Sequence, residues 1–143
     1  MELEKRYFLT YNKVSESNVS DNWNYVEIEK DTLSQMQHLI DGYIDHVTWL
    51  FPELTKNGID IWIDDEGLLK NRSPHVIVYD KNKNDYVVSA IVGTILFARY
   101  DDEGETLGLS LNDIEYIKTY ISNTCDYFNG VIMKDIESIK HES

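Results

Sequence analysis

The sequence predicts an α+β domain with a mostly antiparallel sheet of about five to six strands and two helices packed on one face of that sheet. Three observations lead to this fold class. Several short segments alternate apolar and polar residues, as half-buried strands do. Two segments instead place apolar residues at helical spacing. Asp, Asn, Ser and Gly separate these segments without any linker, so we expect one domain over residues 1–143.

The N-terminal part is expected to form two strands and a helix. Residues 6–11 are rich in aromatic and β-branched types and predict a strand, and polar residues then predict a loop that completes an N-terminal segment, 1–24. Residues 25–29 alternate as a second strand and begin the core, 25–130. A helix follows, with Asp31 as its N-cap and Gly42 as its left-handed C-terminal cap. Its apolar face carries Leu33, Met36, Leu39 and Ile40.

The middle of the chain predicts a run of strands. Residues 43–50 predict one that Pro52 closes. The next has the clearest two-residue period, because Ile59, Ile61 and Ile63 alternate with Asp60, Trp62 and Asp64. Trp62 therefore points away from the isoleucine face, either outward or under a helix or the C-terminal tail. The turn 64–67 follows, with Gly67 at a positive φ.

Two further strands are expected before the last helix. Residues 75–79 predict the first, and a polar connector, 80–85, follows it. Residues 87–99 are the most apolar segment and predict a central strand, in which Gly93 marks a bulge, a bend or a close backbone contact. The turn 101–104 repeats the Asp-Asp-Glu-Gly of residues 64–67.

The last helix is predicted from its cap and its apolar stripe. Ser110 is the expected N-cap, with Asp113 in a near-capping-box position. Asn129 and Gly130 are expected to end the helix, and residues 131–143 form a C-terminal extension with a short helix or strand. The stripe consists of Leu111, Ile114, Ile117, Ile121, Cys125 and Phe128.

The charge is strongly negative. The chain carries 13 Lys and Arg against 26 Asp and Glu, which gives a net charge of −13. Such a field repels nucleic acid and anionic lipid and attracts basic surfaces. We therefore expect no direct nucleic-acid binding, which needs a cationic patch. Solubility alone accounts for the charge equally well.

Cysteine content and hydropathy indicate a cytoplasmic protein. Cys125 is the only cysteine, so no internal disulfide or cysteine-based zinc site is expected, and its place on the apolar stripe indicates a core residue. The N-terminus lacks the apolar stretch of a signal peptide. The most apolar run, 87–98, falls short of the roughly 20 residues of a membrane span.

The histidines suggest one candidate metal site. A three-ligand site built from His38, Asp41 and either His46 or His75 is conceivable. Spacing typical of a zinc protease is absent, and an exposed helix face with a strand histidine is the favoured interpretation. We expect no metal and no cofactor.

Two acidic groups are the candidate partner-binding elements. Their spacing does not match a calcium-binding loop, and solvated turns are favoured over catalytic carboxylates. Carboxylates along a surface can also stand in for phosphates before a Lys/Arg groove. With Trp62 as an aromatic hot spot, the predicted partner-binding residues are Asp60, Trp62, Asp64, Asp65, Glu66, Asp101, Asp102, Glu103 and Glu105.

Short motifs in the middle of the chain resemble those of a known family. They are Leu39–Ile44, Asp64–Gly67 with Asn71 and Arg72, Ile91–Thr94, Asp101–Glu105, and Leu109 with Ser110. In this order they are similar to that family's helix end, acidic turn, buried Gly-Thr strand, second turn and final helix start. The family is the bacterial and phage domain of unknown function 3846, and the resemblance runs from about residue 25 to residue 121. It implies an origin on phages and mobile elements.

A small acidic protein of phage type has few expected functions. The leading hypothesis is a host-defence inhibitor, similar in size and charge to anti-CRISPR proteins, that binds Cas9 and blocks its basic DNA channel. An antirestriction DNA mimic that binds a restriction or modification enzyme is the alternative. A sponge for a nucleotide defence signal, with Arg72 and Arg99 in its pocket, is a third. No nucleophile or phosphate-binding motif is visible, so we do not expect an enzyme.

Overall fold

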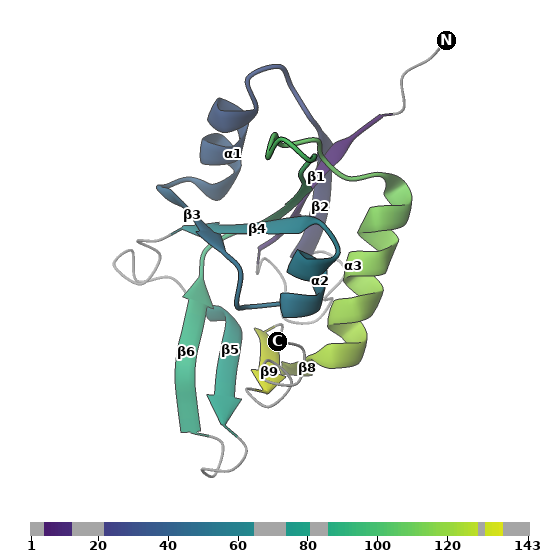
Figure 1. The fold of residues 1–143 in the computed structure, drawn as a ribbon. Coiled ribbons are helices and arrows are strands. Elements are labelled where there is room, and N and C mark those ends of the chain that lie inside the picture. The colour runs from purple at the N-terminus through teal and green to yellow at the C-terminus, as the bar shows by residue number, and fades with distance from the viewer. Residues whose placement is uncertain (1–4, 13–21, 65–73, 81–85, 129–130, 136–143) are drawn as a thin grey trace.

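The computed structural model describes residues 5–12, 22–64, 74–80, 86–128 and 131–135. Within these residues the chain is α+β, as predicted, with a five-stranded antiparallel sheet, a smaller second sheet and three helices (Figure 1). None of the helices in these ranges is long and apolar enough to cross a membrane.

The five-stranded sheet forms the centre of the fold. Each strand is antiparallel to its neighbours. The order across the sheet is β2 (Trp23–Glu27), β1 (Tyr7–Tyr11), β7 (Ile95–Arg99), β4 (Ile59–Asp64) and β3 (Ile44–Val47). β7 is buried on both faces. β2 and β3 are the two edge strands.

A second sheet divides what the sequence predicted as one strand. The segment 87–99 forms β6 (Tyr86–Val92) and β7, which lie in different sheets. Gly93 turns the chain between them with a φ of 84°, a conformation that favours glycine. The order in this sheet is β6, β5 (Pro74–Asp80), β9 (Val131–Asp135) and β8 (Asp126–Phe128), in which β5 and β9 run parallel.

The two long helices cover opposite faces of the five-stranded sheet, whereas we expected both on one face. α1 (Thr32–Ile40) buries Met36 and Ile40 against a cluster that includes Leu96. α3 (Leu111–Thr124) buries Ile114, Ile117 and Ile121 in a larger cluster that includes Phe97. Because neighbouring residues of a strand point to opposite faces, Leu96 and Phe97 place one apolar contact under each helix. The second sheet adds Val76, Val78, Ile91 and Ile132 to the larger cluster.

The helix beginnings agree with the sequence, but their ends do not. The Asp31 carboxylate accepts the N–H of Ser34 at 3.1 Å, as an N-cap does. Asp41, not Gly42, takes the left-handed cap, with a φ of 59°. Its carboxyl side chain tolerates this conformation better than most. Leu33 is 55% exposed and does not share the buried face of α1.

The C-terminal half of the core differs in a similar way. Ser110 and Asp113 form a full capping box at the start of α3. The helix ends at Thr124 rather than at residues 129–130, because Cys125 is already extended and β8 begins directly after it. Phe128 therefore belongs to a strand, and Leu111 is 55% exposed.

A short helix that the sequence did not predict lies between β3 and β4. α2 (Pro52–Lys56) has Pro52 in its first turn, where the missing N–H costs nothing, so this proline begins a helix instead of closing a strand. Phe51 and Leu54 anchor it and are fully buried. β9 shows that the C-terminal extension contains a strand. The predicted Gly67 turn and most of the connector 80–85 lie outside the described residues.

Candidate partner-binding surface

The turn after β7 is held by its own backbone and by one carboxylate. Tyr100 and Thr106 form an antiparallel bridge across its base. The Asp101 carboxylate accepts the backbone N–H groups of Glu103 and Glu105, both at 2.9 Å. Gly104, at a φ of 81°, donates its N–H to the Asp101 carbonyl at 3.0 Å. Asp101 is therefore a structural residue that fixes the shape of the turn.

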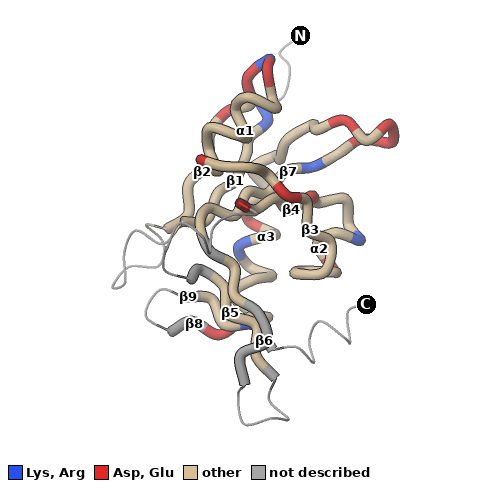
Figure 2. The backbone as a smooth tube through the Cα atoms, turned by 90° about the vertical axis from the view of Figure 1, so that its left-hand side faces the viewer, with Lys and Arg blue, Asp and Glu red and all other residues tan. Residues whose placement is uncertain are grey.

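The remaining carboxylates of the turn face solvent. Asp102, Glu103 and Glu105 are exposed, and no ion pair joins them to another residue in the described ranges. Figure 2 shows the turn as a projection beyond β7 with acidic residues at its tip. Three negative charges thus sit on a preformed turn without a basic neighbour to neutralise them.

Aromatic and aliphatic side chains lie near the base of this turn. Tyr100 and Leu107 flank it in the chain and are 36% and 43% exposed, and Tyr116 of α3 is 37% exposed. Both tyrosines lie close enough to Arg99 for their charge to affect its pKa. The Tyr116 hydroxyl accepts a hydrogen bond from the Asn57 side chain at 3.1 Å. We call this set the acidic-aromatic surface: Tyr100, Asp102, Glu103, Glu105, Leu107 and Tyr116.

An ion pair beneath this surface ties three elements together. Arg99, at the end of β7, donates from Nε and Nη2 to the two carboxylate oxygens of Asp113 in α3, at 3.1 and 2.8 Å. Its third nitrogen, Nη1, donates to the carbonyl of Asn57, which follows α2, at 3.0 Å. Two-point pairs of this kind fix geometry as well as charge. The base of the acidic turn is therefore anchored to two helices.

The pKa values in this pair follow from the geometry. Burial raises the pKa of Asp113, but the hydrogen bonds from Arg99 and from Ser110 outweigh it, so the pKa is lowered. The hydrogen bond to Asp113 raises the pKa of Arg99. Arg99 was a candidate for a nucleotide pocket, but its guanidinium is engaged by Asp113 and Asn57. The other candidate, Arg72, lies outside the described residues.

The acidic residues of β4 do not join this surface. Asp60 and Asp64 are only 9% and 4% exposed, so they are not the solvated turn carboxylates that the sequence suggested. Strand alternation places them on the same face of β4 as Trp62, which packs against the α1 cluster. The two-residue period was correct, but it did not show that both faces of the strand are packed. Asp65 and Glu66 lie outside the described residues.

The two acidic groups are also far apart. Ile59, at the start of β4, pairs with Arg99, at the end of β7, so the acidic turn follows the strand end that lies beside Ile59. Asp64 is at the other end of β4, and a rise of about 3.3 Å per residue separates it from Ile59 by roughly 16 Å. The structure thus places Asp101–Glu105 and Asp64 at opposite ends of the sheet, not in one continuous row.

β3 and β4 bring together a group that sequence reasoning missed. His46 Nε2 lies 2.9 Å from the Asp60 carboxylate, and the His46 ring stacks on Trp62 with 4.6 Å between centroids. Trp62 packs against the α1 cluster, and its buried Nε1 has no hydrogen-bond partner in the described part of the chain. Trp62 is therefore a packing residue rather than an exposed hot spot. His46 lies opposite Trp62 in the register of β3 and β4. Pairing these two strands in that register would have revealed the group.

The suggested histidine metal site is not assembled in the described residues. His38 is exposed on α1, Asp41 caps the same helix, and His46 is paired with Asp60. The side chain of His75 is not described. Across the described ranges no group of three His, Cys, Asp or Glu side chains could hold a metal ion. Cys125 is buried in the core, as predicted.

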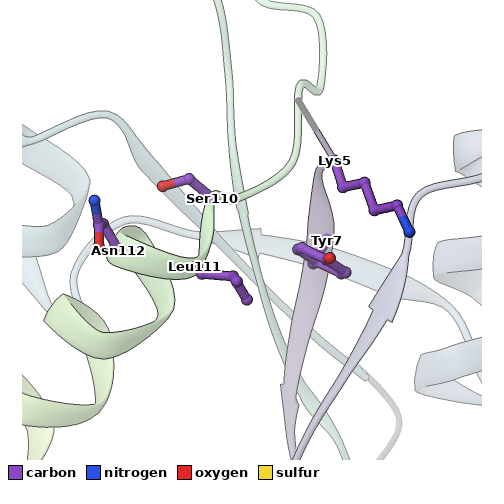
Figure 3. A pocket seen from close by; sticks show the side chains of 5 residues that line it. All are labelled: Lys5, Tyr7, Ser110, Leu111 and Asn112. Atoms are coloured by element: carbon purple, nitrogen blue, oxygen red, sulfur yellow. The ribbon is translucent and has the colours of Figure 1, made fainter. Parts of the chain in front are cut away.

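Two pockets open on other parts of the surface. One, of about 320 Å³, lies between β1 and the start of α3 and is lined by Lys5, Tyr7, Ser110, Leu111 and Asn112. In Figure 3 Leu111 points toward Tyr7, whereas Lys5 points away from α3. The Lys5 amine therefore does not complete an anion site at this helix start. The second, of about 510 Å³, lies between β2 and α1.

Comparison with known families matches most of the chain. The profile of the family described as "Domain of unknown function (DUF3846)" matches residues 18–122. No curated protein matches the chain, and neither does any solved structure.

Proposed function

Because this chain belongs to the DUF3846 family, whose description assigns no activity, we propose its function from its surface: it binds a basic nucleic-acid-binding protein through the acidic-aromatic surface. The observation that carries this proposal is the turn itself. Three exposed carboxylates project from a turn that Asp101 and the Arg99–Asp113 pair hold in one shape. A preformed turn loses little conformational entropy on binding.

The composition of the surface suits a protein partner. Tyrosine combines a large apolar ring with a hydroxyl and is enriched among the residues that dominate binding energy. Tyr100 and Tyr116 supply such rings, partly exposed, near the base of the turn. The net charge of −13 speeds encounter with a basic surface at low ionic strength.

The partner we propose is Cas9 in the cytoplasm of a bacterial host, which makes the chain a phage-type anti-CRISPR protein. The DNA channel of Cas9 is lined with positive charge that holds the heteroduplex and the displaced strand. A turn with three carboxylates offers that channel a competing anion. A restriction or modification enzyme has a comparable basic cleft and is the alternative partner.

The test is inhibition of DNA cleavage by purified, guide-loaded Cas9, with a type I restriction enzyme assayed in parallel. The variant Asp102→Lys/Glu103→Lys reverses two charges of the turn and keeps Asp101. The matched control Asp45→Lys/Glu53→Lys makes the same charge change at exposed positions on β3 and α2. We expect the turn variant to inhibit at least about tenfold more weakly than wild type, and the control to stay within about threefold. Equal inhibition by both variants would exclude the turn, and inhibition of neither enzyme by wild type would exclude both partners.

A further inference from the structure

The outer edge of β2 is open in the described part of the chain. Among the described strands, β2 is the last of its sheet and pairs only with β1, and residues 24–27 are exposed. The Asn12 N–H donates to the Asn22 carbonyl, and the Ile28 N–H donates to the Arg6 carbonyl. These two bonds show which residue pairs between β1 and β2 are hydrogen-bonded. Hydrogen-bonded and non-bonded pairs alternate in such a ladder. The peptide groups of Tyr25 therefore point away from β1.

One end of this edge is already paired, by a side chain. Gln35 of α1 donates from Nε2 to the Glu27 carbonyl at 2.9 Å and accepts the Glu29 N–H through Oε1 at 2.8 Å. This is the pattern with which the N–H and C=O of one residue in a parallel neighbouring strand would bridge the residues on either side of Ile28. The geometry of the edge thus suits strand pairing, and Gln35 leaves the stretch around Tyr25 available.

The pocket of about 510 Å³ lies beside this edge. Its lining combines the apolar residues Val26, Ile28 and Leu39 with polar ones. Val26 pairs with Phe8, a member of the α1 cluster, so Val26 faces the α1 side of the sheet. Side chains of an added strand on that side would lie over Val26 and enter the pocket.

The other side of the edge carries a different chemistry. Tyr25 is 55% exposed, and its ring meets Tyr7 edge to face at 5.2 Å between centroids. Glu27 is exposed two residues further along the same side. A cation there would face the Tyr25 ring and the Glu27 carboxylate together. Glu29 adds negative charge to the pocket lining.

We propose that the outer edge of β2 binds an extended segment of a partner protein by strand addition, with alternating aliphatic and Lys or Arg side chains. The aliphatic side chains enter the pocket against Val26 and Leu39, and the cations face Tyr25 and Glu27. Main-chain hydrogen bonds supply the affinity in this mode, and alternate side chains supply the specificity. The proposal shares with the proposed function only a basic protein partner. It depends on none of the residues of the acidic-aromatic surface, so either proposal can fail alone.

The test uses the full chain and a fluorescein-labelled hexapeptide that alternates Lys and Val. Two further probes separate strand addition from simple charge attraction. The first alternates Glu and Val. The second keeps the Lys-Val sequence but carries backbone N-methyl groups on alternate residues. It is made in two forms, one methylated on the Lys residues and one on the Val residues. The charge is unchanged, while in one of the two forms the N–H groups that would face the β2 edge are removed. Binding is followed by fluorescence anisotropy.

The matched variants are Tyr25→Pro and Tyr25→Ala. Both remove the ring, but only proline removes the outward N–H, and the ladder with β1 survives because that N–H does not take part in it. We expect the Lys-Val peptide to bind Tyr25→Pro at least about tenfold more weakly than Tyr25→Ala. We also expect the Glu-Val peptide and one of the two N-methylated forms to bind wild type at least about tenfold more weakly than the Lys-Val peptide.

Three outcomes would overturn the proposal. One is no anisotropy change with the Lys-Val peptide up to millimolar concentration. Another is equal affinity of wild type for the Lys-Val peptide and its N-methylated forms, which would reduce the binding to electrostatics. The third is equal affinity of the two Tyr25 variants. The N-methyl comparison stands by itself if Tyr25→Pro does not fold.

Discussion

Arg99 and Asp113 form a two-point ion pair, with nitrogen–oxygen distances of 2.8 and 3.1 Å, that joins the end of β7 to the first turn of α3. The same Asp113 carboxylate closes the capping box by accepting the N–H of Ser110 at 3.0 Å. One side chain therefore serves the helix start and the anchor of the acidic turn. The candidate surface depends on this junction for its shape.

Replacement of Asp113 by Asn is expected to destabilise the chain in a pH-dependent way. The folded pKa of Asp113 is below its ordinary value of 3.8, so its stabilisation is complete above that value and is lost as the pH falls through the folded pKa. Since Arg99 and Asp113 are both partly exposed, we expect the free energy of unfolding to fall by only about 1 kcal/mol at pH 7. Urea unfolding at pH 7 and at pH 2.5 measures this difference. A difference between wild type and variant that grows toward acid would contradict the assigned role.

Two glycines of the same loop provide a matched pair. Gly104 and Gly108 have φ values of 81° and 82°, so alanine is strained equally at both. A Cβ at Gly104 meets open space, whereas a Cβ at Gly108 would overlap Ile28 Cδ1 and lie 3.1 Å from Arg6 Cβ. We expect Gly104→Ala to lower the free energy of unfolding by about 1 kcal/mol through backbone strain. Gly108→Ala should lower it by at least about 1 kcal/mol more, because its methyl group overpacks the site. Equal midpoints in thermal unfolding would show that the loop does not pack on Ile28 as described.

The pair formed by His46 and Asp60 is expected to support the edge of the sheet. His46→Ala leaves Asp60, whose side chain is 12% exposed, without the contact that its carboxylate makes at 2.9 Å. We expect a loss of about 1–2 kcal/mol in the free energy of unfolding. His38→Ala is the control, because His38 is exposed on α1, and its effect should stay within about 0.5 kcal/mol. Similar effects of the two substitutions would mean that the pair adds nothing to stability.

The features that the sequence predicted correctly depend on nearby residues. Asp31 and Ser110 are caps because a side-chain oxygen reaches an N–H three residues on. The turn at Asp101 follows from local hydrogen bonds and from Gly104. These interactions close within a few residues, so their sequence signals are direct.

The features that the sequence did not predict depend on which segments meet in space. The low exposure of Asp60 accompanies its contact with His46 of the neighbouring strand and the packing of Trp62, on the same face, against the α1 cluster. Gly93 was recognised as irregular, but only the pairing partners of β6 and β7 show that it separates two sheets. The partnership of Arg99 with Asp113 joins residues 14 positions apart on different elements. A single sequence carries no sign of such contacts.

The central claim is that the acidic-aromatic surface contacts the partner. Amide hydrogen exchange of the chain, measured alone and with guide-loaded Cas9, tests it most directly. The claim predicts slower exchange on binding at residues 100–107 and in the first turns of α3, with no change in α2 or β3. Slower exchange confined to other elements, or unchanged exchange at 100–107 in a complex that demonstrably forms, would contradict it.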